Sequence, residues 1–496
     1  MPGDAFDVVV IGAGLGGLAC AARLARAGAT VLVVERGQQP GGLAGSFHRD
    51  GFDLELSLHL VDAIGPGDPN RWVIDELGLS RHLELDRPDG QRREIWPDGD
   101  SHVPVGIEPW CDELATTFPT ERHGFEQLAR VAAQAHGHFQ VTTTAGGTPG
   151  VATAPHGRRT AAEVVDELIT DRRAGARLEL FARGWLGLPL RRLSAPAFLV
   201  AWYSYQAFGG YYPRGGSAAL VAGLVAQLTQ AGGELVVRSE AQRIVVEHGR
   251  VRGVELDGGR RISAAVVVAN ASPCHIPGEL VADHAVDERY RRRLARLEPS
   301  VSCVKVWLGL SRPATPLERA DYQVYLCPTY DDQASELDPA KRRLCVVRPA
   351  ALGPGHVPAG REVVTITMLV QADRWQHARA RDPSLGETLA DRMVEHVERQ
   401  LLTGLQDGTV VRSVATPETF ERYTGHPAGA IYGAHRAVGS TKGWRLDGAT
   451  PVAGLWLVGA STHPGAGVSS VLTSGCLTAR AVLKTLAHRQ RGRSEA

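Results

Sequence analysis

Hydrophobic positions along this chain of 496 residues fall into two kinds of pattern. Continuous apolar runs such as Asp7–Ile11 and Thr30–Val34 predict strands that are buried on both faces of a parallel sheet. The run Leu18–Ala27 between them is rich in small residues and predicts a helix packed closely on that sheet. From about residue 70 to 210 the pattern is instead helical and irregular, with an amphipathic helix indicated at residues 72–79. The opening segment is therefore a βαβ unit, followed by a different kind of structure.

The turn after the first strand carries the spacing G-x-G-x-x-G. Gly12 permits the tight turn, Gly14 lets the backbone approach a pyrophosphate, and Gly17 lets helix and strand pack closely. Glu35 closes the second strand, where its carboxylate can accept hydrogen bonds from ribose hydroxyls and would repel a 2′-phosphate. A turn that only packs a helix on a sheet would leave Glu35 unexplained. The unit therefore predicts the binding of a dinucleotide without a 2′-phosphate.

Strands, helices and glycine-rich turns like those of the opening βαβ unit occur again in two later segments of the chain. Evenly spaced strand signals at 234–237, 241–247, 250–256 and 261–271 follow a helix at 218–231. Near the end, a buried strand at 454–460, a Gly-rich turn at 461–467 and a small-residue helix at 468–481 form a second anion site. The fold predicted is α/β, with a Rossmann-type dinucleotide-binding domain interleaved with an α+β substrate-binding domain. Residues 1–70, 211–275 and 411–496 are assigned to the first domain, and 71–210 and 276–410, with strands at 301–310, 344–347 and 363–370, to the second.

Charge and cysteine content exclude several classes of protein. The 54 basic and 54 acidic residues cancel, so the chain lacks the basic footprint that a nucleic-acid partner requires. The seven cysteines are scattered without ligand spacing, which argues against a metal site and a disulfide framework. Neither a signal peptide nor a run of about 18 apolar residues is visible, so a cytoplasmic location is expected. Peripheral contact with the inner face of a membrane stays open.

Two further segments have alternative interpretations. The aromatic residues between Phe198 and Tyr212 line either an apolar substrate tunnel or a membrane-touching face, or they belong to an ordinary core helix. Residues 141–162 form a low-complexity stretch that we expect to be a loop, mobile rather than a functional lid.

Several motifs resemble the phytoene desaturase and carotenoid isomerase family of FAD-dependent oxidoreductases, which share an amine-oxidase-like FAD fold. They are the Gly-Gly pair in residues 38–47, the turn Thr462–Gly467, Pro213–Gly216, and residues 416–433, which look more like the isomerase branch. Gln38 and Gln39 stand where the family often has a cation. The resemblance implies FAD as cofactor, held by Gly12, Gly14, Gly16, Gly17, Glu35, Arg36, Gly41, Gly42, Leu43, Ala44, Gly459, Ala460, Gly467 and Val468.

The resemblance also implies the chemistry. A lipophilic substrate, such as a carotenoid, isoprenoid or other polyene, would be desaturated by hydride transfer to flavin while a base takes a proton. His59, which follows the family-like strand 51–59, and His435 and His463 are the candidate catalytic groups, each with the alternative of a structural histidine. Same-fold isomerases, saturases and oxidases of polar natural products remain alternatives, as does a non-catalytic prenyl-binding escort protein. One G-x-G-x-x-G unit leaves no NAD(P)H domain, so electrons are expected to pass to oxygen or a quinone.

Overall fold

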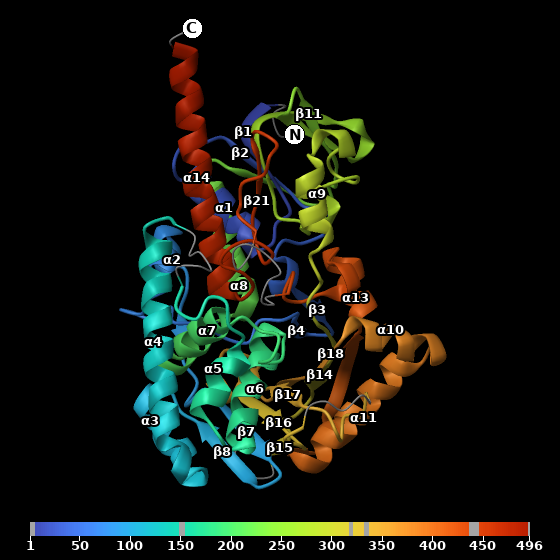
Figure 1. The fold of residues 1–496 in the computed structure, drawn as a ribbon. Coiled ribbons are helices and arrows are strands. Elements are labelled where there is room, and N and C mark those ends of the chain that lie inside the picture. The colour runs from blue at the N-terminus through green and yellow to red at the C-terminus, as the bar shows by residue number, and fades with distance from the viewer. Residues whose placement is uncertain (1–4, 148–153, 317–320, 332–336, 436–445, 495–496) are drawn as a thin grey trace.

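A parallel sheet built from distant parts of the chain forms the upper half of the molecule (Figure 1). The computed structural model describes residues 5–147, 154–316, 321–331, 337–435 and 446–494. In this sheet β1 (Ala5–Ile11) lies between β2 (Val31–Val34) and β13 (Arg261–Ala269), and both pairs are parallel. The strands β10 (Glu234–Val236) and β21 (Leu455–Leu457) add to it in parallel, while β12 (Arg250–Leu256) and β11 (Ala241–Glu247) extend it as an antiparallel hairpin.

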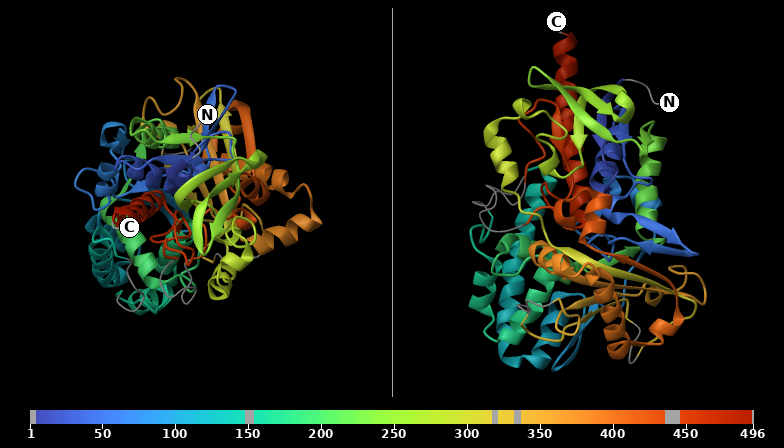
Figure 2. Two further views of the ribbon diagram at one scale, coloured as in Figure 1. Left: turned by 90° about the horizontal axis from the view of Figure 1, so that it is seen from above. Right: turned by 90° about the vertical axis from the view of Figure 1, so that its right-hand side faces the viewer.

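Two helices from opposite ends of the chain pack side by side against this sheet (Figures 1 and 2). They are α1 (Leu15–Ala25) and α14 (Val468–Ser494). Small residues permit the contact, because a Cβ placed on Gly475 would lie 2.6 Å from the Cβ of Ala19. The helices α8 (Gly216–Gln230) and α2 (Arg71–Glu76) pack beside them. The predicted βαβ unit and the predicted C-terminal helix are therefore both present, and α14 runs further than its pattern indicated.

A second, antiparallel-rich sheet lies in the lower half of the molecule. Its order is β20 (Thr409–Ala415), β14 (Ser302–Leu310), β18 (Glu362–Val370), β17 (Leu344–Val347), β16 (Gln323–Leu326), β7 (Arg92–Trp96) and β8 (Gly99–Val103). One of its faces packs on α11 (Leu385–Gln400) through an apolar cluster. The helices α9 (Glu288–Ala295), α10 (Ala372–Arg381) and α13 (Pro417–Thr424) connect or flank these strands.

A separate helical cluster covers the other side of the lower half (Figure 1). It consists of α3 (Ile107–Thr117), α4 (Arg122–Thr144), α5 (Ala161–Leu168), α6 (Arg172–Leu186) and α7 (Ala195–Phe208), which share one apolar core. Short pairs of strands link the halves: β3 (Ser46–Arg49) with β4 (Phe52–Glu55), and β9 (Gly210–Pro213) with both β5 (Val61–Asp62) and β6 (Leu85–Asp86). The fold is α/β with interleaved segments, and the five-segment boundaries stay a prediction. The last predicted boundary, between residues 410 and 411, falls inside β20, which begins at Thr409 and pairs with β14 of the second sheet.

The expectation of a loop over residues 141–162 is wrong at both ends. Helix α4 continues to Thr144, and α5 begins at Ala161; residues 148–153 lie outside the described part. Threonines usually favour a helix weakly, but the hydroxyls of Thr142 and Thr144 here donate back to the carbonyls of His138 and Gln140, both at 2.8 Å. The side chains thereby join the helix instead of competing with it.

The aromatic stretch between Phe198 and Tyr212 lies mostly inside the protein. Phe198, Trp202 and Tyr212 are buried, and the Trp202 ring packs edge-on against Trp110 at 4.9 Å between centroids. The alternative of a membrane-touching face is therefore wrong for these three side chains. The core-helix interpretation holds for most of α7, while Tyr205 faces a cavity.

Candidate cofactor site and active site

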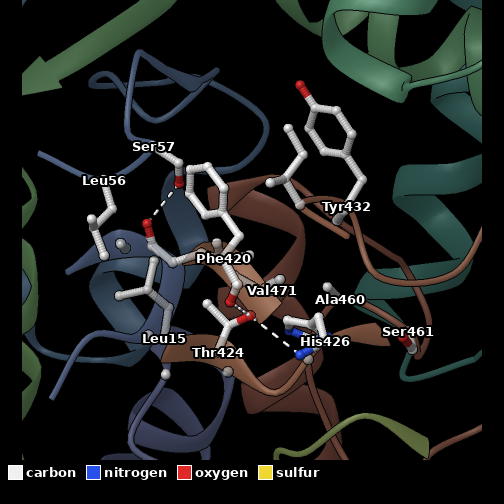
Figure 3. Close-up of a pocket in the computed structure, with 18 of the residues that line it drawn as sticks. Leu15, Leu56, Ser57, Phe420, Thr424, His426, Tyr432, Ala460, Ser461 and Val471 are labelled. Carbon is white, nitrogen blue, oxygen red and sulfur yellow. Dashed lines mark hydrogen bonds between the residues drawn. The ribbon is translucent and has the colours of Figure 1, made fainter. Parts of the chain in front are cut away.

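One cavity of about 740 Å³ runs between the two sheets. Its walls come from both ends of the chain and from the second sheet. Figure 3 labels wall residues from four distant parts of the sequence: Leu15, the Leu56–Ser57 pair, the segment from Phe420 to Tyr432, and Ala460–Ser461. A site of this kind cannot form until the whole chain has folded.

Three glycine-rich turns meet at the N-terminus of α1. Gly14 bridges to Gly41 in parallel, and the N–H of Gly41 donates to the carbonyl of Ala13 at 2.8 Å. A Cβ on Gly16 would lie 2.9 Å from the Cα of Gly459, so the first and last turns touch through bare backbone. Free N–H groups at a helix N-terminus and a side-chain-free cradle suit a pyrophosphate. The residues present therefore fit a dinucleotide.

Glu35 fixes the geometry of the first turn. Its carboxylate accepts a hydrogen bond from the N–H of Ala13 and another from the N–H of Gly37, each at 2.7 Å. Arg36 follows it and lies 3.8 Å from the carboxylate of Glu240. All three of the charged residues in this region line the cavity, so this end carries charge of both signs.

The structure places the predicted residues unequally. Every predicted cofactor residue except Gly17 lines the cavity; Gly17 packs instead on the first turn, where a Cβ would overlap the carbonyl oxygen of Gly12. His59 lines the cavity, whereas His435 and His463 do not. His463 is buried with its ring 5.9 Å from that of Phe139. The functional roles of these residues stay predictions, but the geometry brings only His59 of the three histidines to the cavity wall.

His59 is held as a neutral imidazole. Its Nδ1 lies 3.3 Å from the amide nitrogen of Gln323 and 4.0 Å from the Sγ of Cys345, and its carbonyl oxygen accepts from the Tyr322 hydroxyl. Burial and the nearby Lys305 ammonium lower the pKa of His59 to about 3. A neutral imidazole has one donor and one acceptor nitrogen, and the side-chain amide of Gln323 pairs with Nδ1.

Sequence reasoning missed Lys305 as a site residue. It lies on β14, lines the cavity, and donates to the carbonyl oxygen of Leu56 at 2.9 Å. Burial lowers the pKa of its amine. The available signal was its rarity, because only four of the 54 basic residues are lysines and this one interrupts an apolar strand.

Asn270 was also missed. It follows β13 and places its side chain among the glycine turns, with its Nδ2 3.4 Å from the carbonyl of Gly12. A Cβ on Gly14 would lie 2.7 Å from the same Nδ2. A lone polar residue directly after an apolar strand was the only hint in the sequence.

The segment after α13 forms another wall. Phe420, Thr424 and His426 line the cavity, with the His426 N–H donating to the Thr424 hydroxyl at 3.2 Å (Figure 3). Burial lowers the pKa of His426 to about 4, and the adjacent His275 and Arg36 act in the same direction. The sequence segment that resembles carotenoid isomerases is thus part of the site.

A second, smaller cavity of about 80 Å³ adjoins the first and shares Tyr205 with it. Its buried Asp62 carboxylate accepts from Ser204 at 2.6 Å, from Asn70 at 3.1 Å and from the Ser469 hydroxyl. Ser469 stands in the first turn of α14, next to the cofactor-site residues. Asp62 therefore anchors the helix whose N-terminus faces the main cavity.

These features define the class of protein. A Rossmann-type sheet, Gly-rich turns from both ends of the chain and a cavity reaching a second sheet are those of an FAD-binding oxidoreductase. Within the described residues no group of three or more His, Cys, Asp or Glu could hold a metal. None of the helices in the described part of the chain combines the length and apolar composition that a bilayer crossing requires.

Comparison with known proteins gives the family. The chain belongs to the flavin containing amine oxidoreductases, whose family model matches residues 15–483. Prolycopene isomerase of Daucus carota is 25% identical over 98% of this chain and 81% of the relative. Phytoene desaturase (lycopene-forming) of Pseudescherichia vulneris is 25% identical over 96% of this chain and 99% of the relative. The chain is thus an FAD-dependent oxidoreductase, which sets aside the non-catalytic escort alternative.

Solved structures agree on the fold. An oxidoreductase from Methanosarcina mazei superposes with a TM-score of 0.69 at 18% identity, covering 96% of this chain and 99% of that one. A redesigned putrescine oxidase gives a TM-score of 0.68 at 17% identity, covering 98% of this chain and all (100%) of that one. The family match gives FAD as the cofactor, and the glycine turns as its binding site stay a prediction that their geometry fits.

Proposed function

We propose that this enzyme desaturates a lipophilic, isoprenoid-like molecule. The observation that carries the proposal is the continuity of the cavity, which passes from the glycine turns into a compartment walled by Trp185, Tyr205, Tyr325 and Tyr432. Aromatic walls suit an extended unsaturated substrate. The names of the relatives, phytoene desaturase and prolycopene isomerase, support the same substrate class.

Bound FAD supplies a two-electron acceptor that takes a hydride from carbon, with oxygen or a quinone as the final electron acceptor. The chain's own residues supply positioning, exclusion of water and a place for the proton. Lys305 is the group that we propose takes the proton, in the neutral amine form that its burial in the cavity wall favours by lowering its pKa. His59, whose pKa is about 3, is a weak base and acts instead as a neutral hydrogen-bond donor.

The experiment compares lipid extracts of cells that express the wild-type protein or Lys305→Met. Mass spectrometry should find a product that is two hydrogens lighter than its precursor and that appears only with the wild type. Purified FAD-loaded protein should then convert the isolated precursor. A product that is two hydrogens heavier would indicate a saturase, and a new carbonyl or imine group in place of a new C=C bond would indicate an oxidase; either result overturns desaturation.

A same-fold isomerase is the second candidate. It is favoured by the position of residues 420–432, which resemble the isomerase branch and line the cavity through Phe420, Thr424 and Tyr432. An isomerase leaves the substrate mass unchanged and alters only its chromatographic retention. The same extracts therefore distinguish the two reactions.

A further inference from the structure

Polar side chains form a row across the sheet that floors the cavity. Lys305 on β14 stands directly opposite Thr367 on β18, Thr367 is opposite Cys345 on β17, and Cys345 is opposite Tyr325 on β16. Directly opposed residues of antiparallel strands project from the same face. Gln323, two residues before Tyr325, shares that face as well. All five residues line the cavity.

The row is confined to the cavity side of the sheet. The alternate positions on the same strands, among them Val304, Ile366 and Val346, belong to the apolar cluster packed on α11. An antiparallel sheet commonly has one apolar face on the core and one polar face in water. Here the polar face lines the cavity, so these side chains are the ones that a ligand in the cavity would contact.

Hydrogen bonds within the protein leave part of this row unsatisfied. The Gln323 amide nitrogen reaches His59 at 3.3 Å and the Cys345 sulfur at 3.5 Å, and the Tyr325 hydroxyl also bonds to Cys345. The Oε1 of Gln323 and the Oγ1 of Thr367 have no hydrogen-bond partner among the described residues. These side chains are only 2% and 8% exposed, so bulk water does not replace the missing partner. Both atoms lie beneath the surface of the cavity that their residues line, so a ligand pairs with them once these side chains rotate towards the cavity.

The two unsatisfied atoms suit a ligand that carries an oxygen, because one of them is a hydrogen-bond acceptor and the other a donor. Gln323 Oε1 accepts, whereas the Thr367 hydroxyl can donate. The His59 ring, which also lines the cavity, adds a further hydrogen-bonding nitrogen. A hydroxyl group donates and accepts, and a carbonyl accepts. A hydrocarbon does neither, and it would leave the buried polar atoms desolvated without compensation.

We propose that the substrate is a lipophilic molecule carrying a hydroxyl or carbonyl oxygen, which Gln323, Thr367 and His59 bind. This inference rests on the proposed function and narrows its substrate class, since it excludes a pure hydrocarbon polyene. The row spans roughly 14 Å across four strands. Lys305 at one end contacts the Leu56 segment beside the cofactor turns, while Gln323 lies at the far end.

The test measures binding without turnover. The FAD-loaded protein is titrated with geranylgeraniol, with its aldehyde, and with the matching hydrocarbon in which hydrogen replaces the hydroxyl. Binding is followed by quenching of tryptophan fluorescence, because Trp185 lines the cavity. The wild type should bind at least one oxygenated probe about tenfold or more tightly than the hydrocarbon, since a site built to pair with an oxygen rejects an analogue that lacks it.

Two variants test whether Gln323 and Thr367 cause the preference for the oxygenated probe. In the double variant Gln323→Leu/Thr367→Val the preference for the oxygenated probe should fall towards unity. The matched control is Thr365→Val, which removes a hydroxyl from the same face of β18 at a position that does not line the cavity; it should keep the preference. Bound FAD, measured by its visible absorption, should be equal in all three proteins. Loss of FAD from the double variant would show that the row serves the cofactor instead, which overturns the inference.

The wild-type measurement alone can also overturn the inference. Equal or tighter binding of the hydrocarbon, or no binding of either oxygenated probe, contradicts it. Failure of the proposed function gives a different combination of results in the turnover and binding assays. If a hydrocarbon loses two hydrogens in the turnover assay, desaturation stands and this inference falls. If the oxygenated probes bind selectively but the extracts contain no lighter product, the inference stands and desaturation falls.

Discussion

Replacing Gly14 with alanine probes how the two ends of the chain build the cofactor site. The added methyl group would lie 2.7 Å from the amide nitrogen of Asn270, closer than packed atoms tolerate. Asn270 has little freedom to move, because its Nδ2 faces the Gly12 carbonyl at 3.4 Å and its Oδ1 packs against Gly459. Relief of the contact must therefore shift either Asn270 or one of the turns. Gly12, Gly14, Gly459 and Asn270 all line the cavity, so the shift reaches the cofactor.

The expected magnitude follows from the cost of overpacking. One extra methyl group in a tightly packed site costs about 1–3 kcal/mol. If the bound state carries this cost, the dissociation constant for FAD rises roughly 5- to 150-fold. Calorimetric titration of FAD into the apo-protein measures the change. Gly137→Ala is the control, because Gly137 lies in α4 with no atom near the added methyl; this variant should bind FAD as the wild type does.

A second substitution separates two explanations for the loss. In Gly14→Ala/Asn270→Ala the contact with the amide is gone, and FAD affinity should partly recover. A double variant as weak as the single one would mean that the methyl group obstructs the cofactor itself, which is the reason that the sequence motif alone suggests. Unchanged FAD affinity in Gly14→Ala would refute the steric argument altogether.

Three further outcomes are expected. Asp62→Leu removes the acceptor of the buried Ser204 and Ser469 hydroxyls and of the half-buried Asn70 amide, and should lower the free energy of unfolding of the apo-protein by roughly 3 kcal/mol or more in urea titrations; a change within experimental error would contradict the anchoring role. Burial lowers the pKa of His136 from 6.5 to about 4, so the unfolded state binds the extra proton in that range and stability is lost as the pH falls from 6.5 towards 4. In His136→Gln the pH dependence of the unfolding free energy should be shallower by about 1.4 kcal/mol per pH unit, and an unchanged slope would contradict this. Lys305→Met should retain FAD and apo-protein stability, since it replaces a buried amine by an apolar side chain of similar length, yet slow flavin reduction by substrate about 10²–10⁴-fold in stopped-flow absorbance; unaltered reduction would exclude Lys305 as the proton acceptor.

The parts of the site that the sequence could predict are those with short-range signals. The strand, glycine turn, helix and acidic residue of the first βαβ unit all fall within 35 residues, and the structure contains β1, α1 and β2 in that order. The last strand, turn and helix are equally local. The contact between Gly16 and Gly459 could be anticipated only as two anion sites serving one long dinucleotide.

Features that depend on long-range register could not be predicted. The row from Lys305 to Tyr325 is set by strand pairings across β14, β18, β17 and β16, and no local pattern specifies which residues face one another. The same limitation applies to lone histidines. His59 and His463 both lie next to predicted cofactor segments, but the direction of each ring depends on its tertiary packing, and only His59 lines the cavity. The loop prediction for residues 141–144 was wrong because these residues continue helix α4, where the hydroxyls of Thr142 and Thr144 bond to carbonyls of the preceding turn.

Membership of a family establishes the cofactor of this chain more firmly than its substrate. The family model, which matches residues 15–483, establishes the flavin cofactor, and the glycine turns are the residues predicted to hold it. The substrate contacts the second sheet, where a single polar residue at an alternate strand position changes which ligands are tolerated. The unsatisfied oxygens of Gln323 and Thr367 belong to this chain's own register, and a hydrocarbon cannot satisfy them. Cofactor and fold therefore follow from the family, whereas the substrate must be argued from the floor of the cavity.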